Sequence, residues 1–222
     1  MENFNFKKGN VIVNFQFKTS NTKTGALIQN YIIPASWIES DAHIKTLSDS
    51  EVCFDCDHGK SKKATCYVRK SNSERGLISK VKSLRNIGLE NIPELSPESE
   101  ADLLNAIEGR GVRFGSYGEP ILLGEALIGK ISKRAKFWTG YTHQWHKNNW
   151  AKDYFMASVE SELVSKVAQK SGFRTFFVGD TQSKEYVTCP ASKEAGNKTT
   201  CDNCKLCMGT QSKAKSVTIL PH

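Results

Sequence analysis

Alternating apolar and polar residues form the first regular pattern along the chain, and they predict β-strands. The alternation covers 11–17, and an apolar run at 27–33 follows the turn-like segment 20–25. A polar stretch at 39–50 comes next. We therefore expect two strands before the first helix, with a loop after them.

Apolar residues at helical spacing predict four helices further along the chain. They occupy 77–84, 97–107, 123–131 and 163–168. Ser96 and Pro97 form a favourable N-cap and first-turn pair for the second of these helices. Gly88 and Gly172 are expected to end the first helix and the last.

Short, nearly all-apolar runs between these helices predict a parallel sheet that is buried on both faces. The runs cover 112–116, 137–141, 154–159 and 173–178, with a final strand expected at 216–220. Too few strands fit for a closed eight-stranded barrel. The expected fold class is therefore α/β, an incomplete parallel (βα) barrel. We expect the barrel at residues 1–180 and a cysteine-rich tail without regular periodicity at 181–222.

Seven cysteines fall into two groups along the chain. The front cysteine group consists of Cys53, Cys56 and Cys66, and the tail cysteine group consists of Cys189, Cys201, Cys204 and Cys207. Four thiolates complete the coordination of a metal ion or cluster, whereas three leave one metal position open. The tail group is therefore expected to be structural, and the front group is expected to take part in chemistry.

Disulfides are the alternative explanation for so many cysteines. The chain begins Met-Glu-Asn-Phe without the segments of a signal peptide, and no run approaches the roughly 18 apolar residues of a membrane span. We therefore expect a cytoplasmic protein without a membrane partner. In that compartment cysteine clusters indicate metal or redox chemistry rather than disulfides.

The spacing of the cysteines limits what each group is expected to bind, but it does not choose between iron–sulfur and zinc. The run Cys201-x2-Cys204-x2-Cys207 is typical of 4Fe–4S ferredoxin-like sites, but two Cys-x2-Cys hooks also suit zinc. In the front group, His58 offers a fourth ligand for a Cys3His zinc site. Iron–sulfur and zinc both remain open.

Four segments with reactive side chains follow predicted strands. They are the front cysteine group and the segments 115–120, 141–146 and 157–160. In parallel α/β folds the carboxyl ends of the strands meet at one edge, where active sites lie. His143 is the candidate general base or substrate-positioning residue, and the alternative is a hydrogen-bonded histidine at a strand end.

The segment 113–123 resembles the glycine-rich second-strand motif of radical S-adenosylmethionine enzymes. It reads as a strand, then Gly118-Glu119-Pro120, then aliphatic residues that open a helix. The resemblance implies that the front group holds a 4Fe–4S cluster with one open iron for S-adenosylmethionine, and that the tail holds a second cluster. The front spacing, Cys53-x2-Cys56-x9-Cys66, differs from the Cys-x3-Cys-x2-Cys of that family. The residues expected to contact the cofactor are Tyr67, Ser116, Gly118, Glu119 and Ser158.

Most of the chain also resembles the gene product 88 family of phages and plasmids. The matching features are 21–25, the pair Cys66-Tyr67, 113–120, 139–145, 156–159, and Cys189-Pro190-Ala191-Ser192 followed by 201–207. The resemblance implies a phage-like origin and a place in the host cytoplasm. It implies no particular activity.

Charge bears on the expected partner. The chain carries 31 Lys and Arg against 23 Asp and Glu, a net charge of +8. This excess suits phosphate contacts, and Gln144, Trp145 and His146 offer stacking and polar groups for a base or sugar. A solvated basic surface and a tryptophan in the core are the alternatives.

These patterns together predict an iron–sulfur protein, in the form of a radical S-adenosylmethionine-like enzyme that acts on a nucleotide or nucleic acid. Redox activity would require an electron donor as a partner. The alternative is a non-enzymatic zinc-binding module that binds nucleic acid or has a regulatory role.

Overall fold

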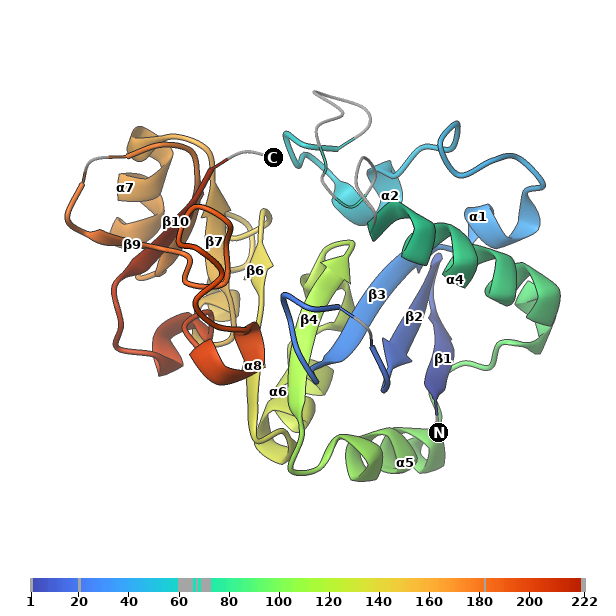
Figure 1. Cartoon of the computed structure of the whole chain (residues 1–222). Helices are drawn as coiled ribbons and strands as arrows, with labels where there is room; N and C mark the ends of the chain where they lie inside the picture. The colour runs from blue at the N-terminus through green and yellow to red at the C-terminus, as the bar shows by residue number, and fades with distance from the viewer. Residues whose placement is uncertain are drawn as a thin grey trace.

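The computed structural model describes residues 2–19, 21–59, 66, 68, 73–181 and 183–220, which form two five-stranded sheets with helices around them (Figure 1). In spatial order, the strands of the first sheet are β1 (Asn3–Lys8), β2 (Val11–Gln16), β3 (Ile28–Pro34), β4 (Gly111–Tyr117) and β5 (Phe137–Thr139). Those of the second sheet are β6 (Tyr141–Thr142), β7 (Met156–Val159), β8 (Thr175–Val178), β10 (Ser216–Ile219) and β9 (Tyr186–Thr188).

The first sheet is mixed. Strands β1, β2 and β3 pair antiparallel, whereas β3, β4 and β5 pair parallel. A tight turn joins β1 to β2, and in it Gly9 has φ 56°, a left-handed conformation that glycine reaches without strain. The strands predicted at 11–17 and 27–33 are confirmed as β2 and β3, while β1 has no counterpart among the predicted strands.

The second sheet is parallel throughout, and the chain enters it at Gly140. This residue separates β5 from β6, so the single strand predicted at 137–141 is divided between the two sheets. A Cβ atom at Gly140 would lie 2.7 Å from Cδ1 of Phe155, which is buried and packs edge-on against Phe114. Only a residue without a side chain fits where the chain crosses from one sheet to the other.

The expected incomplete parallel barrel is wrong. The protein is α/β, but three strands at its amino end run antiparallel and the remaining strands are divided between two sheets. The physical reason is local. A hairpin joined by a tight turn pairs antiparallel, and the close packing at Gly140 separates strands that a barrel would keep continuous.

The described helices lie on both sheets and connect their strands (Figure 1). The α-helices are α1 (Ser36–Glu39), α2 (Ser50–Cys53), α4 (Ser73–Ile87), α5 (Pro97–Ile107), α6 (Glu125–Arg134), α7 (Glu162–Lys170) and α8 (Cys201–Cys204). Short 3-10 turns are η1 (Leu89–Asn91), η2 (Pro120–Leu123), η3 (Asn149–Asp153) and η4 (Gly209–Gln211). The four predicted helices are confirmed as α4, α5, α6 and α7, and Ser96 caps α5 in a reciprocal capping box with Ser99.

Helix α7 turns its larger apolar side chains outward. Leu163 is 75% exposed and Val167 is 50% exposed, while Ser165 and Ala168 are buried against the second sheet. The hydroxyl of Ser165 donates a hydrogen bond of 3.0 Å to Oγ1 of Thr175 on β8. Small side chains therefore set the close approach of this helix to the sheet.

The tail contains more regular structure than its sequence predicts. The segment 181–215 includes β9, α8 and η4, and the final strand expected at 216–220 is confirmed as β10, which lies between β8 and β9. Within the part of the chain that the structure describes, no helix is long and apolar enough to cross a membrane.

Candidate functional site

The front cysteine group lies in a loop between β3 and α4. Cys53 ends α2, and two consecutive turns follow, closed by hydrogen bonds from the amide of Cys56 to the carbonyl of Cys53 (2.9 Å) and from the amide of Gly59 to the carbonyl of Cys56 (3.0 Å). The amide of Cys66 then donates to the carbonyl of His58 at 3.0 Å. These hydrogen bonds bring the loop back so that Cys66 lies close to Cys53 and Cys56.

Charge around the front group is negative. Burial raises the pKa of the Cys53 thiol most, and the neighbouring Asp49, Cys56, Cys66 and Glu119 raise it further. Asp49 and Glu119 are both buried carboxylates. The three thiols therefore share one environment with two acidic side chains, and this environment favours the protonated form of Cys53.

Glu119 joins three parts of the molecule at this site. Its amide donates to the carbonyl of Val52 in α2 at 2.8 Å. Its carboxylate, which is only 4% exposed, accepts hydrogen bonds from Oγ1 of Thr142 (2.6 Å) and from the amide of His143 (2.9 Å). These contacts hold the end of β4 and the end of β6 against the loop that carries the front cysteines.

The ring of His143 is oriented by the same carboxylate. Its Nδ1 lies 2.8 Å from Oε1 of Glu119. Burial of the ring works to lower the pKa of His143, but the neighbouring Cys56 and Glu119 side chains outweigh this effect and hold that pKa well above 6.5. This shift favours the protonated form of His143, whose positive charge partly offsets the negative charge around it.

Two further side chains complete a carboxylate–histidine cluster, which we define as His58, Glu119, His143 and Glu160. Oε1 of Glu160 lies 3.7 Å from Nε2 of His143 and 3.6 Å from Nε2 of His58. The two histidine rings meet edge to face, with centroids 6.4 Å apart. Glu119 follows β4, His143 follows β6 and Glu160 follows β7, so three of the strand-end segments singled out in the sequence do converge with the front cysteine loop.

The glycine-rich motif has a packing explanation. Gly118 has φ 76°, and a Cβ atom there would lie 2.5 Å from the carbonyl oxygen of Ile32 on β3. The hydroxyl of Ser116 donates to Oε1 of Gln29 at 2.6 Å. Ser158 is buried on β7. The expected contact of Tyr67 with a cofactor lies outside the described residues.

The tail cysteine group also converges. Burial raises the pKa of Cys207 to about 12, with Arg113 acting against it and Cys189, Cys201 and Cys204 adding to it. Burial likewise raises the pKa of Cys201, and Arg113 again opposes the shift. The four tail thiols therefore lie together beside the guanidinium of Arg113, which stacks 4.4 Å from the ring centroid of Tyr141.

Arg174 and Asp202 fix the tail to the rest of the protein. The guanidinium of Arg174 donates to four backbone carbonyls of the tail, those of Leu206, Gly209, Ala214 and Lys215. The carboxylate of Asp202 accepts from the amide of Ala26 at 3.1 Å, and the amide of Cys201 donates to the carbonyl of Lys23 at 3.0 Å. The loop before β3 thus lies beside α8, as Figure 1 shows.

Trp145 is not available for base stacking in this structure. It is buried and packs edge-on against Phe173 and His146. The Nε2 of Gln144 donates to the carboxylate of Asp55, and Lys147 lies 3.4 Å from the same carboxylate. The core explanation for Trp145, kept open by the sequence, therefore applies.

The donor atoms suit a metal, although the side chains do not yet enclose one. All seven cysteines are described, and each keeps its thiol rather than forming a disulfide. Among the described residues, no three His, Cys, Asp or Glu side chains are close enough, as they stand, to hold a metal ion. Buried thiols that raise one another's pKa are nevertheless the groups that a bound cation stabilises as thiolates.

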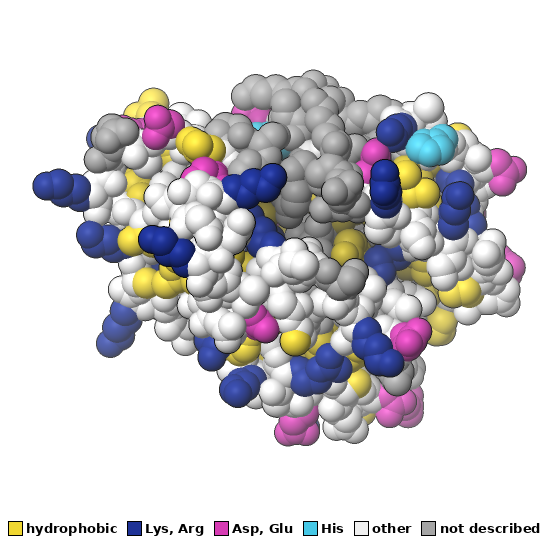
Figure 2. All heavy atoms as spheres, viewed as in Figure 1, with side chains coloured by type: hydrophobic (Ala, Val, Ile, Leu, Met, Phe, Trp, Pro, Cys, Tyr) yellow, Lys and Arg dark blue, Asp and Glu magenta, His cyan; other side chains and the backbone are white. Residues whose placement is uncertain are grey.

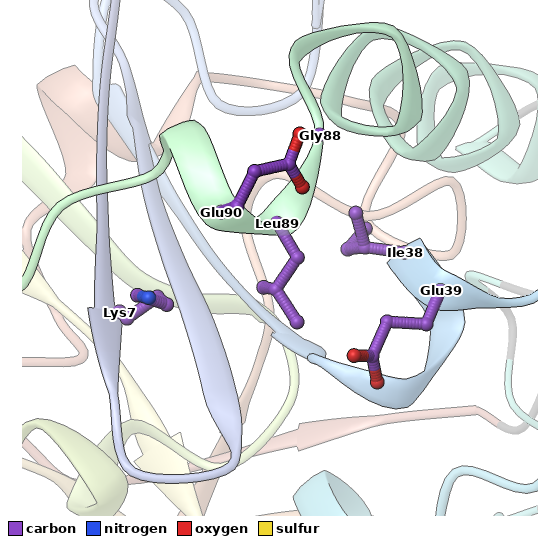
Figure 3. A pocket seen from close by; sticks show the side chains of 6 residues that line it. All are labelled: Lys7, Ile38, Glu39, Gly88, Leu89 and Glu90. Atoms are coloured by element: carbon purple, nitrogen blue, oxygen red, sulfur yellow. The ribbon is translucent and has the colours of Figure 1, made fainter.

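The described cavities lie away from these groups. Figure 3 shows one of about 360 Å³, in which Leu89 and Ile38 provide apolar side chains and Lys7, Glu39 and Glu90 provide charged ones. A second cavity, of about 420 Å³, lies between β1 and the start of α6. Neither is lined by a cysteine or by a member of the carboxylate–histidine cluster.

Lys and Arg side chains are spread over the face seen in Figure 2, with Asp and Glu among them, rather than gathered in one patch. The positive charge is therefore a weak guide to a binding surface on this face. Comparisons with protein-family models, with curated proteins and with solved structures found no match to this chain.

Sequence reasoning missed several residues of the site. Asp49, Arg113 and Arg174 are ordinary charged residues in the sequence, and only folding brings them to the cysteines. Asp202 had one available signal, because it lies between Cys201 and Cys204.

Proposed function

We propose that this protein is an iron–sulfur enzyme of the radical S-adenosylmethionine kind, with its chemistry at the front cysteine group. The proposal rests on the site and not on the fold, since the barrel expected for such an enzyme is absent. The observation that carries it is the convergence of three thiols with a buried carboxylate–histidine pair, Glu119 and His143. Three thiolates leave a cluster with one open iron.

In this proposal the residues of the chain have distinct tasks. Cys53, Cys56 and Cys66 hold the 4Fe–4S cluster, which supplies an electron for cleavage of S-adenosylmethionine when both are bound. Glu119 keeps the His143 ring in a fixed orientation, because Nδ1 is committed to its carboxylate at 2.8 Å. His143 is then the candidate to give or take a proton at Nε2.

The tail cysteine group has a structural task in the same proposal. Its four thiols suit a closed site, either a second 4Fe–4S cluster or a zinc ion. The guanidinium of Arg113 beside these thiols favours their ionised form. The substrate is proposed to be a nucleotide or nucleic acid on the basis of the net charge of +8, and an external electron donor is required.

Anaerobic reconstitution tests this function. We expect the purified protein to take up iron and sulfide, and its reduced electron paramagnetic resonance signal to change when S-adenosylmethionine is added. The Cys56→Ala variant should lose the responsive signal, whereas the matched Cys204→Ala variant should keep it. Zinc at both cysteine groups, with no iron after reconstitution, would reject the proposal.

One observation favours a second candidate, a zinc-binding module that binds nucleic acid without catalysis. His58 lies next to the front group, since its carbonyl accepts from the amide of Cys66 at 3.0 Å, and a Cys3His set suits zinc. This candidate predicts a colourless protein that contains zinc and binds DNA or RNA with an affinity that falls steeply with salt. A titration at several salt concentrations, with and without chelator, distinguishes the two.

A further inference from the structure

The carboxylate–histidine cluster contains one carboxylate oxygen, Oε1 of Glu160, that lies close to two imidazole nitrogens. Parallel pairing of β6 and β7 sets Thr142 opposite Ala157, so the residues that follow these strands emerge at the same edge of the second sheet. His143 and Glu160 are at this edge. His58 approaches the same point from the front cysteine loop, on the other side.

The spacing of these atoms is close to that of ligands on one metal ion. Oε1 of Glu160 lies 3.7 Å from Nε2 of His143 and 3.6 Å from Nε2 of His58. Donors with bonds of about 2.0 Å to a tetrahedral zinc ion are about 3.3 Å apart. These two distances therefore need to shorten by a few tenths of an ångström, in line with the finding that the described side chains do not enclose an ion as they stand.

Two of the three atoms have unmet bonding capacity. Nε2 of His143 and Oε1 of Glu160 are buried, and neither makes a hydrogen bond of ordinary geometry within the described residues. Buried polar atoms normally have such a partner, and exceptions call for an explanation such as an ion. A metal ion between them satisfies both atoms at once.

The outer contacts of the cluster also suit a metal. Histidines that bind metals usually donate their other ring nitrogen to a carboxylate, which fixes the ring. Glu119 holds Nδ1 of His143 in this way, at 2.8 Å. Glu119 and Glu160 place two carboxylates around the ring, and a divalent cation neutralises their charge.

We propose that His58, His143 and Glu160 bind a divalent transition-metal ion of the iron-to-zinc series, at a site separate from the three thiolates of the front cysteine group. Two imidazoles and one carboxylate are a ligand set typical of such ions, and they leave coordination positions open for water or a substrate. The inference goes beyond the proposed function, because it needs neither an iron–sulfur cluster nor S-adenosylmethionine, and it assigns Nε2 of His143 to metal binding in place of proton transfer.

Cobalt(II) is a suitable probe, because cobalt bound by nitrogen and oxygen lacks the sulfur-to-metal charge-transfer absorption of thiolate sites. The full-length protein, Glu160→Gln and His58→Gln are compared after equilibrium dialysis with cobalt(II) alone. The controls are Glu185→Gln and His146→Gln, which change the same residue types at exposed positions outside the cluster. Circular dichroism establishes that each variant is folded.

We expect wild type and controls to bind one more equivalent of cobalt than the two cluster variants, or to bind it at least about 10-fold more tightly. Subtracting the spectrum of Glu160→Gln from that of the wild type should leave the d–d bands of cobalt and no sulfur-to-metal charge-transfer band. Two variants are used so that misfolding of one leaves the other informative. Equal binding in all five proteins would overturn the inference.

A further variant separates this site from the proposed function. Cys56→Ala should remove reconstituted iron from the front group while the nitrogen- and oxygen-bound cobalt remains. If Cys56→Ala instead removes that cobalt signal as well, the thiolates and not the cluster hold the ion, and the inference fails. If the wild type shows no iron chemistry but keeps the cobalt signal, the proposed function is rejected and the inferred metal site is not.

Discussion

The two cysteine groups sit in opposite electrostatic surroundings. Around the front group the charged neighbours of Cys53 are Asp49 and Glu119, which raise its pKa beyond the effect of burial. Around the tail group Arg113 opposes the effect of burial on Cys201 and Cys207, and Lys23 opposes it further at Cys201. The charges that act on Cys53 are therefore negative, whereas those that act on Cys201 and Cys207 include a positive one.

This difference indicates different tasks. A site with excess negative charge gains most from a bound cation, and its open coordination leaves room for chemistry. A site whose thiolates are balanced by a guanidinium, and whose loop is anchored by Arg174, is suited to hold structure together. Four predictions test the comparison.

The largest expected effect comes from removing one ligand of each group. Cys204→Ala should lower the melting temperature of the metal-loaded protein by about 10 °C or more, because metal binding orders the tail and contributes directly to folding energy. Cys56→Ala should lose metal from the front group with a much smaller change in melting temperature. Scanning calorimetry with metal analysis measures both, and equal destabilisation would mean that both groups are structural.

Replacement of the arginine that anchors the tail should have the second-largest effect. Arg174→Gln removes a guanidinium that donates to four backbone carbonyls, so we expect a loss of about 2–4 kcal/mol in the free energy of unfolding. Urea denaturation measures it, with the exposed Arg75→Gln as the control. Hydrogen exchange should increase in the tail and not around the front group; a uniform increase would contradict a local anchoring role.

A glycine next to the front site should show a smaller effect. Gly118→Ala combines a left-handed backbone with a Cβ atom 2.5 Å from the carbonyl of Ile32, and we expect the free energy of unfolding to fall by about 2–3 kcal/mol, as measured by urea denaturation. Gly9→Ala is the matched control, since it is also left-handed but has no atom within 4 Å of the added carbon. Its cost should be about 1 kcal/mol. Similar losses in the two variants would show that crowding against β3 is unimportant.

The smallest effect is expected from the charge beside the tail thiols. Arg113→Gln removes the cation that lowers the pKa of Cys201 and Cys207, so both pKa values should rise in the metal-free protein. Ultraviolet absorbance of the thiolates during a pH titration measures this, with Cys204→Ala and Cys56→Ala used to assign the signal. Thiols of the front group should titrate unchanged, and a shift there instead would invalidate the electrostatic contrast.

Periodicity predicted most of the individual elements. Helices α4 to α7 and strands β2, β3, β4, β7, β8 and β10 are all found near their predicted positions, because a buried stripe or a buried strand requires apolar residues at fixed intervals. The arrangement of the strands was predicted wrongly. Nothing in the apolar run at 137–141 shows that Phe155 will pack against Gly140 and direct the chain into a second sheet.

The candidate site was predicted in part. His143 and Glu119 were both selected from the sequence, and they do lie together, but as partners of each other at 2.8 Å. Gly118 was selected for close approach of a cofactor, whereas the close approach in the structure is to Ile32. A glycine in the sequence shows that space is limited but does not show which atom occupies it.

By itself the sequence determined which residues have metal-binding chemistry and how they are spaced, because thiols and imidazoles are properties of residue types. It also determined the helices and strands that apolar periodicity dictates. Only the tertiary structure decided that Asp49 and Glu119 face the front cysteines while Arg113 faces the tail, because electrostatic interactions depend on distances between residues far apart in the chain. Those distances exist only once the two sheets are packed.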